Sequence, residues 1–147
     1  QRTGFFILFI YFFSMTRDLY EVRVGAYIFN DKDEMLFLLN NDNTWGILGG
    51  HMEKGEQIEE TLHREIKEET NLEVDMIKMF DVTTVHHVNS LVLGFACKYK
   101  SGTVILQEEE VKDYKWEQIE KMNEFELTFP LLPEMTTKAL EIINTKN

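Results

Sequence analysis

The sequence holds little cysteine, little proline and comparatively little positive charge. The only cysteine, Cys97, excludes an intramolecular disulfide and suits a reducing compartment, so we expect a cytoplasmic protein. Because Cys97 falls within an apolar strand pattern, we expect a small core residue there rather than a catalytic thiol. The 15 basic residues against 26 acidic ones give a formal net charge of −11. This balance argues against nucleic acid as a partner, although metal ions can let an acidic enzyme act on a polyanion.

A long hydrophobic run is also missing. Residues 5–13 are continuously apolar, but a membrane-spanning helix needs about 20 such residues, so a membrane partner is not expected. No small-residue cleavage site follows this run, which argues against a signal peptide. We expect residues 1–17 to be an extension outside the fold, with Met15 as the natural start, and residues 18–145 to be one domain. A membrane-associating leader is the alternative.

The remaining composition is that of a folded globular domain. Of 147 residues, 44% are apolar and 28% are charged, and no repeat or linker interrupts them. Strand patterns lie at residues 20–29, 34–39, 73–86, 89–100 and 103–107, and in a short stretch that ends at Trp116. Helical patterns lie at residues 57–70, 117–122 and 133–143, and the glycine-containing residues 40–56 are predicted to be a loop. This order predicts a mixed α/β fold of layered type.

The predicted helix at residues 57–70 carries carboxylates beside its apolar face. With Glu65 taken as zero, the apolar residues span roughly 20–100° on a helical wheel, and they are Ile58, Leu62 and Ile66. Glu69 falls inside this stripe at about 40°, Glu65 lies along its edge, and Glu68 falls at about 300°. A solvated acidic helix explains these positions poorly, because an unpaired carboxylate near a core is unstable or shifts its pKa. Three mutually repelling carboxylates need a partner, and Mg²⁺ is a hard cation that takes oxygen ligands.

The spacing of the surrounding residues matches a longer pattern. Gly50, Glu56 and the run Arg64-Glu65-Ile66-Lys67-Glu68-Glu69-Thr70-Asn71-Leu72 resemble the signature of the Nudix hydrolase family. That signature is a Gly, a Glu, then Arg-Glu-apolar-x-Glu-Glu-x-Gly-apolar, and so many fixed positions make it more specific than one short glycine motif. The resemblance is strong over residues 50–72 and extends weakly over about residues 18–145. It implies an α/β fold of the Nudix type, an αβα layered arrangement with a mixed β-sheet between helices.

The sequence departs from the family pattern at two positions. Asn71 replaces the last Gly of the box, at a helix end where a left-handed residue is wanted, and Asn tolerates that conformation best after Gly. Leu48 stands where many members have Pro. Neither change removes a ligand, so the resemblance implies an active enzyme. The alternative from another class is a non-catalytic nucleotide-sensing module on the same fold.

The resemblance also implies a metal site. Glu65, Glu68 and Glu69 match the family's carboxylates that bind Mg²⁺, for which Mn²⁺ can substitute, and one of them can help deprotonate the attacking water. Gly49 matches the residue whose backbone carbonyl joins the metal shell. Family members commonly add one more Glu from outside the box, and the candidates are Glu108, Glu109 and Glu110. Glu110 is preferred because of its spacing from the tryptophan that follows, and a solvated acidic run is the alternative.

Two further residues complete the predicted catalytic set. Arg64 matches a residue that orients the glutamates, and Glu56 is its expected salt-bridge partner. The alternative for Arg64 is a surface ion pair with Glu60 or Glu68 on the same helix. The set predicted to act in catalysis is therefore Glu56, Arg64, Glu65, Glu68 and Glu69.

The implied reaction is metal-assisted attack of water on phosphorus within a diphosphate bridge. Small size, the absence of an added domain and the stretch from Glu109 to Trp116 favour a nucleoside triphosphate as substrate, giving monophosphate and pyrophosphate. ADP-ribose, a nucleoside diphosphate sugar or a dinucleotide is the alternative. The expected partner is thus a small nucleotide, and the sequence leaves the oligomeric state open, a homodimer included.

Overall fold

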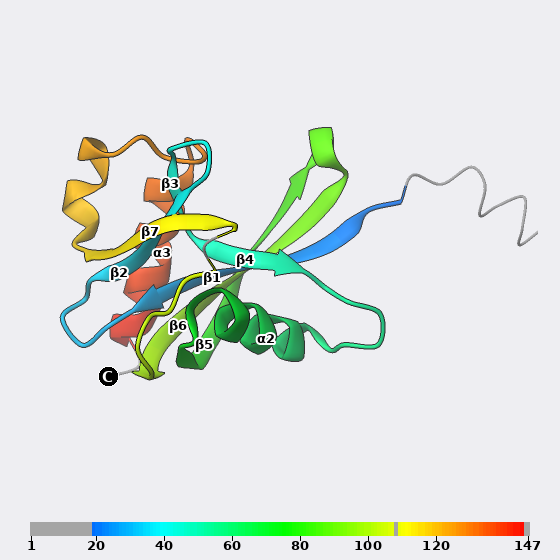
Figure 1. The fold of residues 1–147 in the computed structure, drawn as a ribbon, viewed down its shortest axis with the longest axis horizontal. Helices are drawn as coiled ribbons and strands as arrows, with labels where there is room; N and C mark the ends of the chain where they lie inside the picture. Colours follow the sequence, from blue (N-terminus) through cyan, green and yellow to red (C-terminus); the bar gives the residue numbers. More distant parts are fainter. Residues whose placement is uncertain (1–18, 108, 146–147) are drawn as a thin grey trace, which may run out of the picture.

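The computed structural model describes residues 19–107 and 109–145 (Figure 1). The predicted extension at residues 1–17, with its apolar run and Met15, lies outside the described residues, and so does Glu108. In the part of the chain that is described, no helix is both long enough and apolar enough to cross a membrane.

The described strands form one mixed, seven-stranded sheet. Its central strand β1 (Glu21–Phe29) runs parallel to β6 (Ser90–Ser101) and antiparallel to β4 (Leu48–His51). On the far side of β6 lies β5 (Glu73–Val85), an outer strand whose antiparallel register shifts at three places. On the other side, β2 (Met35–Asn40) pairs with β1, with β3 (Trp45–Gly46) and with β7 (Val111–Glu117). The parallel pairing of β1 with β6 brings together segments that are far apart in the sequence.

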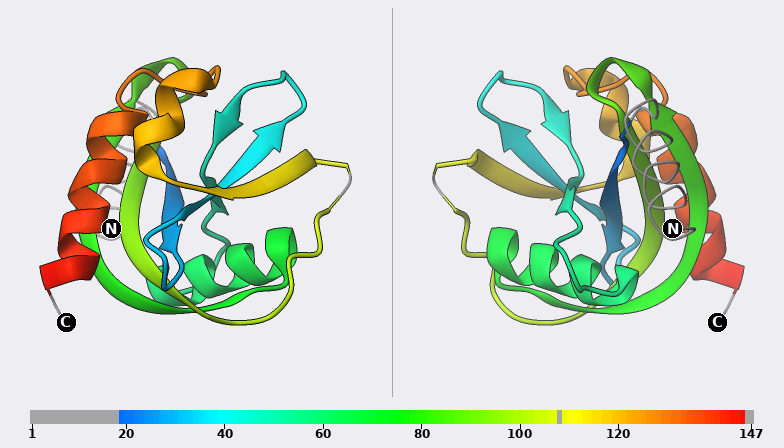
Figure 2. Two further views of the ribbon diagram at one scale, coloured as in Figure 1. Left: turned by 90° about the vertical axis from the view of Figure 1, so that its left-hand side faces the viewer. Right: turned by 90° about the vertical axis from the view of Figure 1, so that its right-hand side faces the viewer.

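Helices cover the two faces of this sheet. In Figure 2, α3 (Leu132–Thr145) lies on one side of β5 and β6, and α2 (Ile58–Thr70) lies on the other. Successive side chains of β1 alternate between these faces, as a strand requires. Val24, Ala26 and Ile28 belong to the core under α2, whereas Tyr27 and Phe29 belong to the core under α3. The predicted αβα layered fold with a mixed sheet is therefore confirmed.

Helix α2 begins and ends close to the predicted residues. The backbone N–H of Gln57 donates a hydrogen bond to the Glu60 carboxylate at 2.8 Å, which satisfies a group at the helix start. The helix ends at Asn71, whose φ of 59° and ψ of 14° are left-handed and whose N–H donates to the carbonyl of Lys67. The prediction that Asn71 takes the place of a helix-ending glycine is confirmed.

Two predictions of local structure are wrong. Residues 103–107 form no strand, because the N–H of Ile105 donates to the carbonyl of Thr70 and the segment is drawn onto the end of α2. Residues 40–56 are not all loop, since β3 and β4 lie within them. Strand β4 escaped prediction because its glycines have low strand propensity. A Cβ on Gly49 would lie 2.1 Å from the carbonyl oxygen of Val24, so only glycine allows this approach to β1.

The other predicted elements agree with the structure. Predicted strands at residues 20–29, 34–39, 73–86 and 89–100 correspond to β1, β2, β5 and β6. The predicted helical turns after Trp116 form a 3₁₀ helix, Ile119–Glu124, and a second one, His86–Val88, joins β5 to β6. The final helix was predicted from Pro133 to Ile143 and extends slightly beyond both ends. Cys97 is fully buried, and burial raises the pKa of its thiol to about 12, as expected for a core residue.

Candidate active site

An ion pair between Arg64 and Glu56 joins the loop after β4 to helix α2. The Nε and Nη2 atoms of Arg64 both donate to the Glu56 carboxylate, the latter at 3.0 Å. The hydroxyl of Thr61 and the N–H of Glu53 also donate to it, at 2.8 and 2.9 Å. The hydrogen bonds from Arg64, and then the one from Glu53, lower the pKa of Glu56 to about 2. The structure thus places Glu56 as the predicted partner of Arg64, and Glu60 caps the helix instead.

The same guanidinium reaches two of the predicted metal carboxylates. Nη1 of Arg64 donates to Glu65 at 3.0 Å and to Glu68 at 3.1 Å, while Nη2 donates to the backbone carbonyl of His51 at 2.9 Å. A planar guanidinium holds several oxygens in fixed directions, so these contacts restrict the rotamers of both glutamates. The contact with the His51 carbonyl, which no local sequence pattern indicates, fixes α2 against the end of β4.

Glu69 is the buried member of the cluster. It is only 8% exposed, and burial, followed by the charge of Glu65, raises its pKa to about 8. The charges of Glu110 and Glu68 act in the same direction, and only a backbone hydrogen bond from Gly49 opposes them. A carboxyl group in this position holds a proton at neutral pH unless a cation neutralises it. The expectation that a carboxylate of this helix lies against the core is confirmed for Glu69.

Glycines make room for these carboxylates. A Cβ on Gly50 would lie 2.2 Å from the carboxyl carbon of Glu65, so this glycine leaves the space that the glutamate occupies. The neighbouring Gly49 contacts Glu69 through its backbone N–H. The predicted metal contact of its carbonyl remains a prediction.

The segment that carries Glu110 is tied to the turn between β2 and β3. The amide of Asn41 donates to the carbonyl of Glu109 at 3.0 Å. The ammonium of Lys112 donates to the carbonyl of Asn41 and to the side chain of Asn43, each at 2.8 Å. Glu110 is exposed, but its charge acts on Glu69, whereas no such effect links Glu109 to the cluster. Glu110 therefore lies close enough to the cluster for its charge to act there, its part as the additional ligand remains a prediction, and Glu108 is outside the described residues.

The described donors fit a hard divalent cation by their charge and chemistry. Three carboxylates contact one guanidinium, and the charges of Glu65, Glu68 and Glu110 act on the buried Glu69. This leaves a surplus of negative charge that oxygen-seeking cations neutralise. Within residues 19–107 and 109–145, however, no three His, Cys, Asp or Glu side chains are already arranged to share one ion. The contacts of Arg64 explain part of this difference, because they engage an oxygen of Glu65 and an oxygen of Glu68.

Two aromatic side chains, those of Trp45 and His86, stand apart from this cluster. The ring of Trp45 packs against Phe125 and lies under the ammonium of Lys115, as a packing residue would. His86 contacts Tyr20 at the exposed end of the β5–β6 hairpin. Neither residue contacts the carboxylates in the part of the chain that is described.

Comparisons with known proteins agree with the pattern of these residues. The family model of the NUDIX domain matches residues 19–137. The NAD-capped RNA hydrolase NudC of Mannheimia succiniciproducens is 38% identical over 96 residues, which are 65% of this chain and 34% of that protein. NudC of Actinobacillus succinogenes is 38% identical over 97 residues, 66% of this chain and 34% of its own. The chain thus spans about a third of the length of these curated relatives.

Solved structures show the same fold at low sequence identity. An ADP-ribose pyrophosphatase from Streptococcus suis has a TM-score of 0.74 and 18% identity over 88% of this chain and 96% of its own. A MutT protein from Methanosarcina mazei has a TM-score of 0.68 and 24% identity, covering 87% and 97%. The match to the domain family covers most of the chain and includes every residue of the box. This protein therefore belongs to the Nudix hydrolase family, whose members generally use divalent metal ions.

Proposed function

We propose that this chain is a Mg²⁺-dependent pyrophosphohydrolase that cleaves the diphosphate linkage of a nucleoside diphosphate derivative. The preferred substrate in this proposal is a nucleoside triphosphate, which gives a nucleoside monophosphate and pyrophosphate. The observation that carries the proposal is the buried Glu69 carboxyl, placed among other carboxylates with Arg64 as their shared cation.

The chain's own residues have separate parts in this reaction. Arg64 restricts the rotamers of Glu65 and Glu68, and Glu56 in turn holds Arg64. When bound, the divalent ion supplies the charge that neutralises a diphosphate and acidifies water. The proposed ligands are Gly49, Glu65, Glu68, Glu69 and Glu110. One of the helix glutamates accepts the proton of the attacking water, so that water is the direct nucleophile and no phosphoenzyme forms.

A second substrate class is favoured by the names of the relatives. The curated relatives are called NAD-capped RNA hydrolases, and one structural neighbour is called an ADP-ribose pyrophosphatase. A dinucleotide, ADP-ribose or a nucleoside diphosphate sugar is therefore our second candidate. The names also bring the capped end of an RNA into consideration, which the sequence-based expectation of no nucleic-acid partner did not include.

A substrate panel with isotope-labelled water tests both candidates. The purified chain is incubated with Mg²⁺ and nucleoside triphosphates, ADP-ribose, NAD or a nucleoside diphosphate sugar, in water labelled with ¹⁸O. For a triphosphate we expect label in the monophosphate or the pyrophosphate and no orthophosphate as a primary product. Orthophosphate with nucleoside diphosphate as first products would show a terminal phosphatase and contradict the proposal. Nucleotide binding without turnover in Mg²⁺ or Mn²⁺ would instead support the sensing module.

We also propose that residues 18–145 form the catalytic domain and that it works in a reducing, cytoplasmic compartment, which suits the buried Cys97 thiol. In this proposal residues 1–17 contribute nothing to turnover. A chain that lacks residues 1–17 should then have the same kcat and KM as the full chain, and a large difference in either would contradict the proposed boundary.

A further inference from the structure

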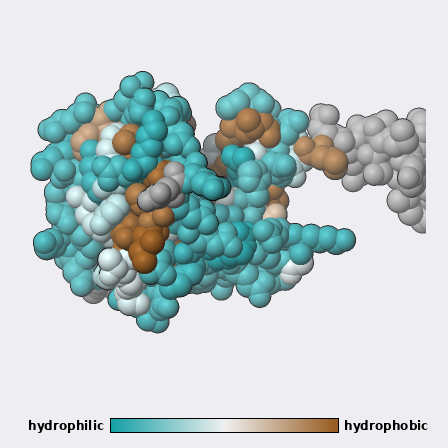
Figure 3. Space-filling view, in the orientation of Figure 1, coloured by the Kyte–Doolittle hydropathy of each residue, from teal (hydrophilic) through white to brown (hydrophobic). Residues whose placement is uncertain are grey.

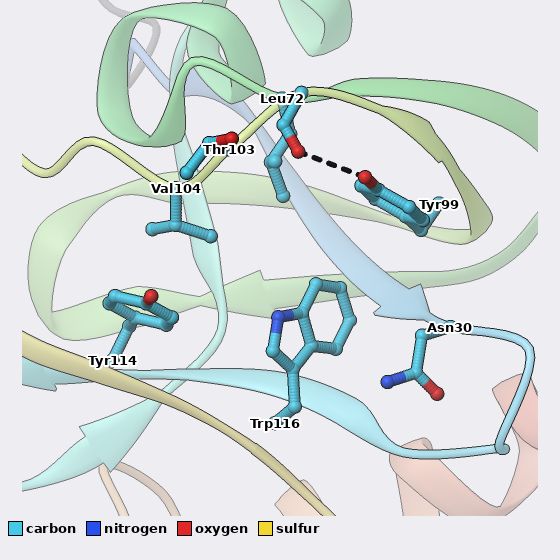
Figure 4. Close-up of a pocket in the computed structure, with 8 residues that line it drawn as sticks. Asn30, Leu72, Tyr99, Thr103, Val104, Tyr114 and Trp116 are labelled. Carbon is cyan, nitrogen blue, oxygen red and sulfur yellow. Dashed lines mark hydrogen bonds between the residues drawn. The ribbon is translucent and has the colours of Figure 1, made fainter.

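A cavity separate from the carboxylate cluster opens between β7, the end of β6 and the loop that follows β6 (Figure 4). Its volume is about 310 Å³, within the usual range for small-molecule sites. Aromatic rings from two strands form much of its wall, and they belong to Tyr99, Tyr114 and Trp116. Leu72 and Val104 add aliphatic surface, and no charged residue lines the cavity. Such a lining suits a planar, uncharged aromatic group better than a phosphate.

Two of these rings present polar atoms that the described part of the chain leaves without a hydrogen-bond partner. They are the hydroxyl of Tyr114 and the indole N–H of Trp116, and neither is a buried unsatisfied group. In Figure 4 the two rings stand beside each other on β7, with the indole nitrogen on the side of Tyr114 and Val104. The hydroxyl of Tyr99, by contrast, donates to the carbonyl of Gly102 at 2.9 Å. The cavity therefore offers stacking surface together with two available donors.

The loop wall of the cavity is fixed to the end of α2 that carries Glu69. Gly102 has a φ of 103°, and a Cβ on it would lie 2.8 Å from the carbonyl oxygen of Asn71. The Asn71 amide donates to the carbonyl of Thr103, and the N–H of Ile105 donates to the carbonyl of Thr70. Figure 3 shows apolar surface at this loop on the face that includes α2. The cavity is thus formed before any ligand binds, which lowers the entropy cost of binding.

One strand connects the cavity to the candidate active site. Glu110 lies in the turn that directly precedes β7. Tyr114 and Trp116 follow on one face of the strand, because residues two apart on a strand point the same way. At about 3.3 Å per residue, the four residues from Glu110 to Tyr114 can span no more than about 13 Å. A single nucleotide could therefore place its phosphates at the carboxylates and its base at the aromatic rings.

We propose that this cavity binds the nucleobase of the substrate, a planar heterocycle that stacks on Trp116 and Tyr114 and accepts hydrogen bonds from them. This inference rests on the proposed function for the source of the base, but base binding itself needs no turnover. Stacking on aromatic side chains tolerates different bases, so the cavity favours nucleobases as a class rather than one base.

Intrinsic fluorescence tests base binding without catalysis. The chain has two tryptophans, and the Trp45→Phe variant leaves Trp116 as the only indole. Titration of this variant with adenosine or guanosine in chelator should change its fluorescence in a saturable way. The matched Trp116→Phe variant keeps Trp45, which belongs to the core on the other face of the sheet, and should not respond. A response from Trp45 alone, or from neither variant, would overturn the proposal.

Kinetics test whether the bound base belongs to the substrate. Tyr114 is 37% exposed, so Tyr114→Ala should fold normally, raise KM about 10-fold and leave kcat unchanged. Tyr20 is 44% exposed and lies outside the cavity, and Tyr20→Ala should leave KM unchanged. Free nucleoside should inhibit hydrolysis competitively. An unchanged KM in folded Tyr114→Ala, or noncompetitive inhibition, would refute the assignment to the substrate's base. A wild-type chain without metal-dependent hydrolysis would refute the proposed function instead.

Discussion

Replacing Glu69 with Gln should make the metal-free protein more stable while it removes activity. Glu69 is buried, and burial together with the charge of Glu65 raises its pKa from 4.5 to about 8. Because the folded-state pKa is the higher one, the folded chain keeps a proton that the unfolded chain releases. The resulting destabilisation is absent below pH 4.5, grows as the pH rises from 4.5 to about 8 and is constant above that.

The size of the effect follows from the difference between the pH and the unfolded-state pKa. At pH 7 this difference is 7 − 4.5 = 2.5, and about 1.4 kcal/mol per unit gives about 3 kcal/mol. Glutamine cannot ionise, so Glu69→Gln should be more stable than the wild type by about this amount in chelator. For a domain of this size the melting temperature should rise by roughly 10 °C. The wild type should become less stable as the pH rises from 4.5 to 8, and the Glu69→Gln variant should not.

Thermal and denaturant unfolding in chelator at several pH values measure this effect, and turnover in Mg²⁺ measures the loss of activity. We expect turnover to fall by about 100-fold or more, since a ligand charge is lost while the fold survives. Glu59→Gln is the matched control, because Glu59 is exposed on the same helix. Its stability should change by less than about 0.5 kcal/mol. A Glu69→Gln protein that is less stable than the wild type in chelator at pH 7, or nearly as active, would refute the reasoning.

Three other substitutions test the surroundings of the cluster. Asn71→Gly should keep activity and hold or raise the free energy of unfolding by at most about 1 kcal/mol, and lost turnover in a folded variant would reveal a chemical role for this side chain. Gly50→Ala should fold but displace the Glu65 carboxylate, lowering kcat about 100-fold, and unchanged kcat would contradict the contact. Lys112→Met should free the segment that holds Glu110. The Mg²⁺ concentration for half-maximal activity should then rise several-fold with substrate KM unchanged, and an unchanged Mg²⁺ requirement would exclude this positioning role.

The helix and its carboxylates were predictable because they depend on local periodicity. The helical wheel placed Glu69 inside the apolar stripe, Glu65 at its edge and Glu68 farthest away. In the structure Glu69 is buried, Glu65 is intermediate and Glu68 is exposed, which follows the same order. The left-handed end at Asn71 was predictable from the conformational tolerance of Asn. The catalytic roles of these residues remain predictions that the substitutions above test.

The features that escaped prediction depend on contacts between distant segments. Strand β4 is defined by its approach to β1, for which glycine is required although glycine is a poor strand former. Residues 103–107 have a strand-like composition, but the end of α2 binds their backbone. The tether from Lys112 to Asn41 joins residues 71 positions apart, and no local pattern encodes it.

The shape of the outer strand β5 affects how the folded chain can associate with another copy of itself. Its pairing with β6 changes register at Glu73/Val74, Met76/Lys78 and Met79/Asp81. Each shift bends the strand and interrupts the regular spacing of the N–H and C=O groups along its outer edge. A straight edge can template the addition of another strand, which is a common start of aggregation, and an interrupted edge cannot do so over its full length. A second copy could therefore not extend the sheet along the whole length of β5.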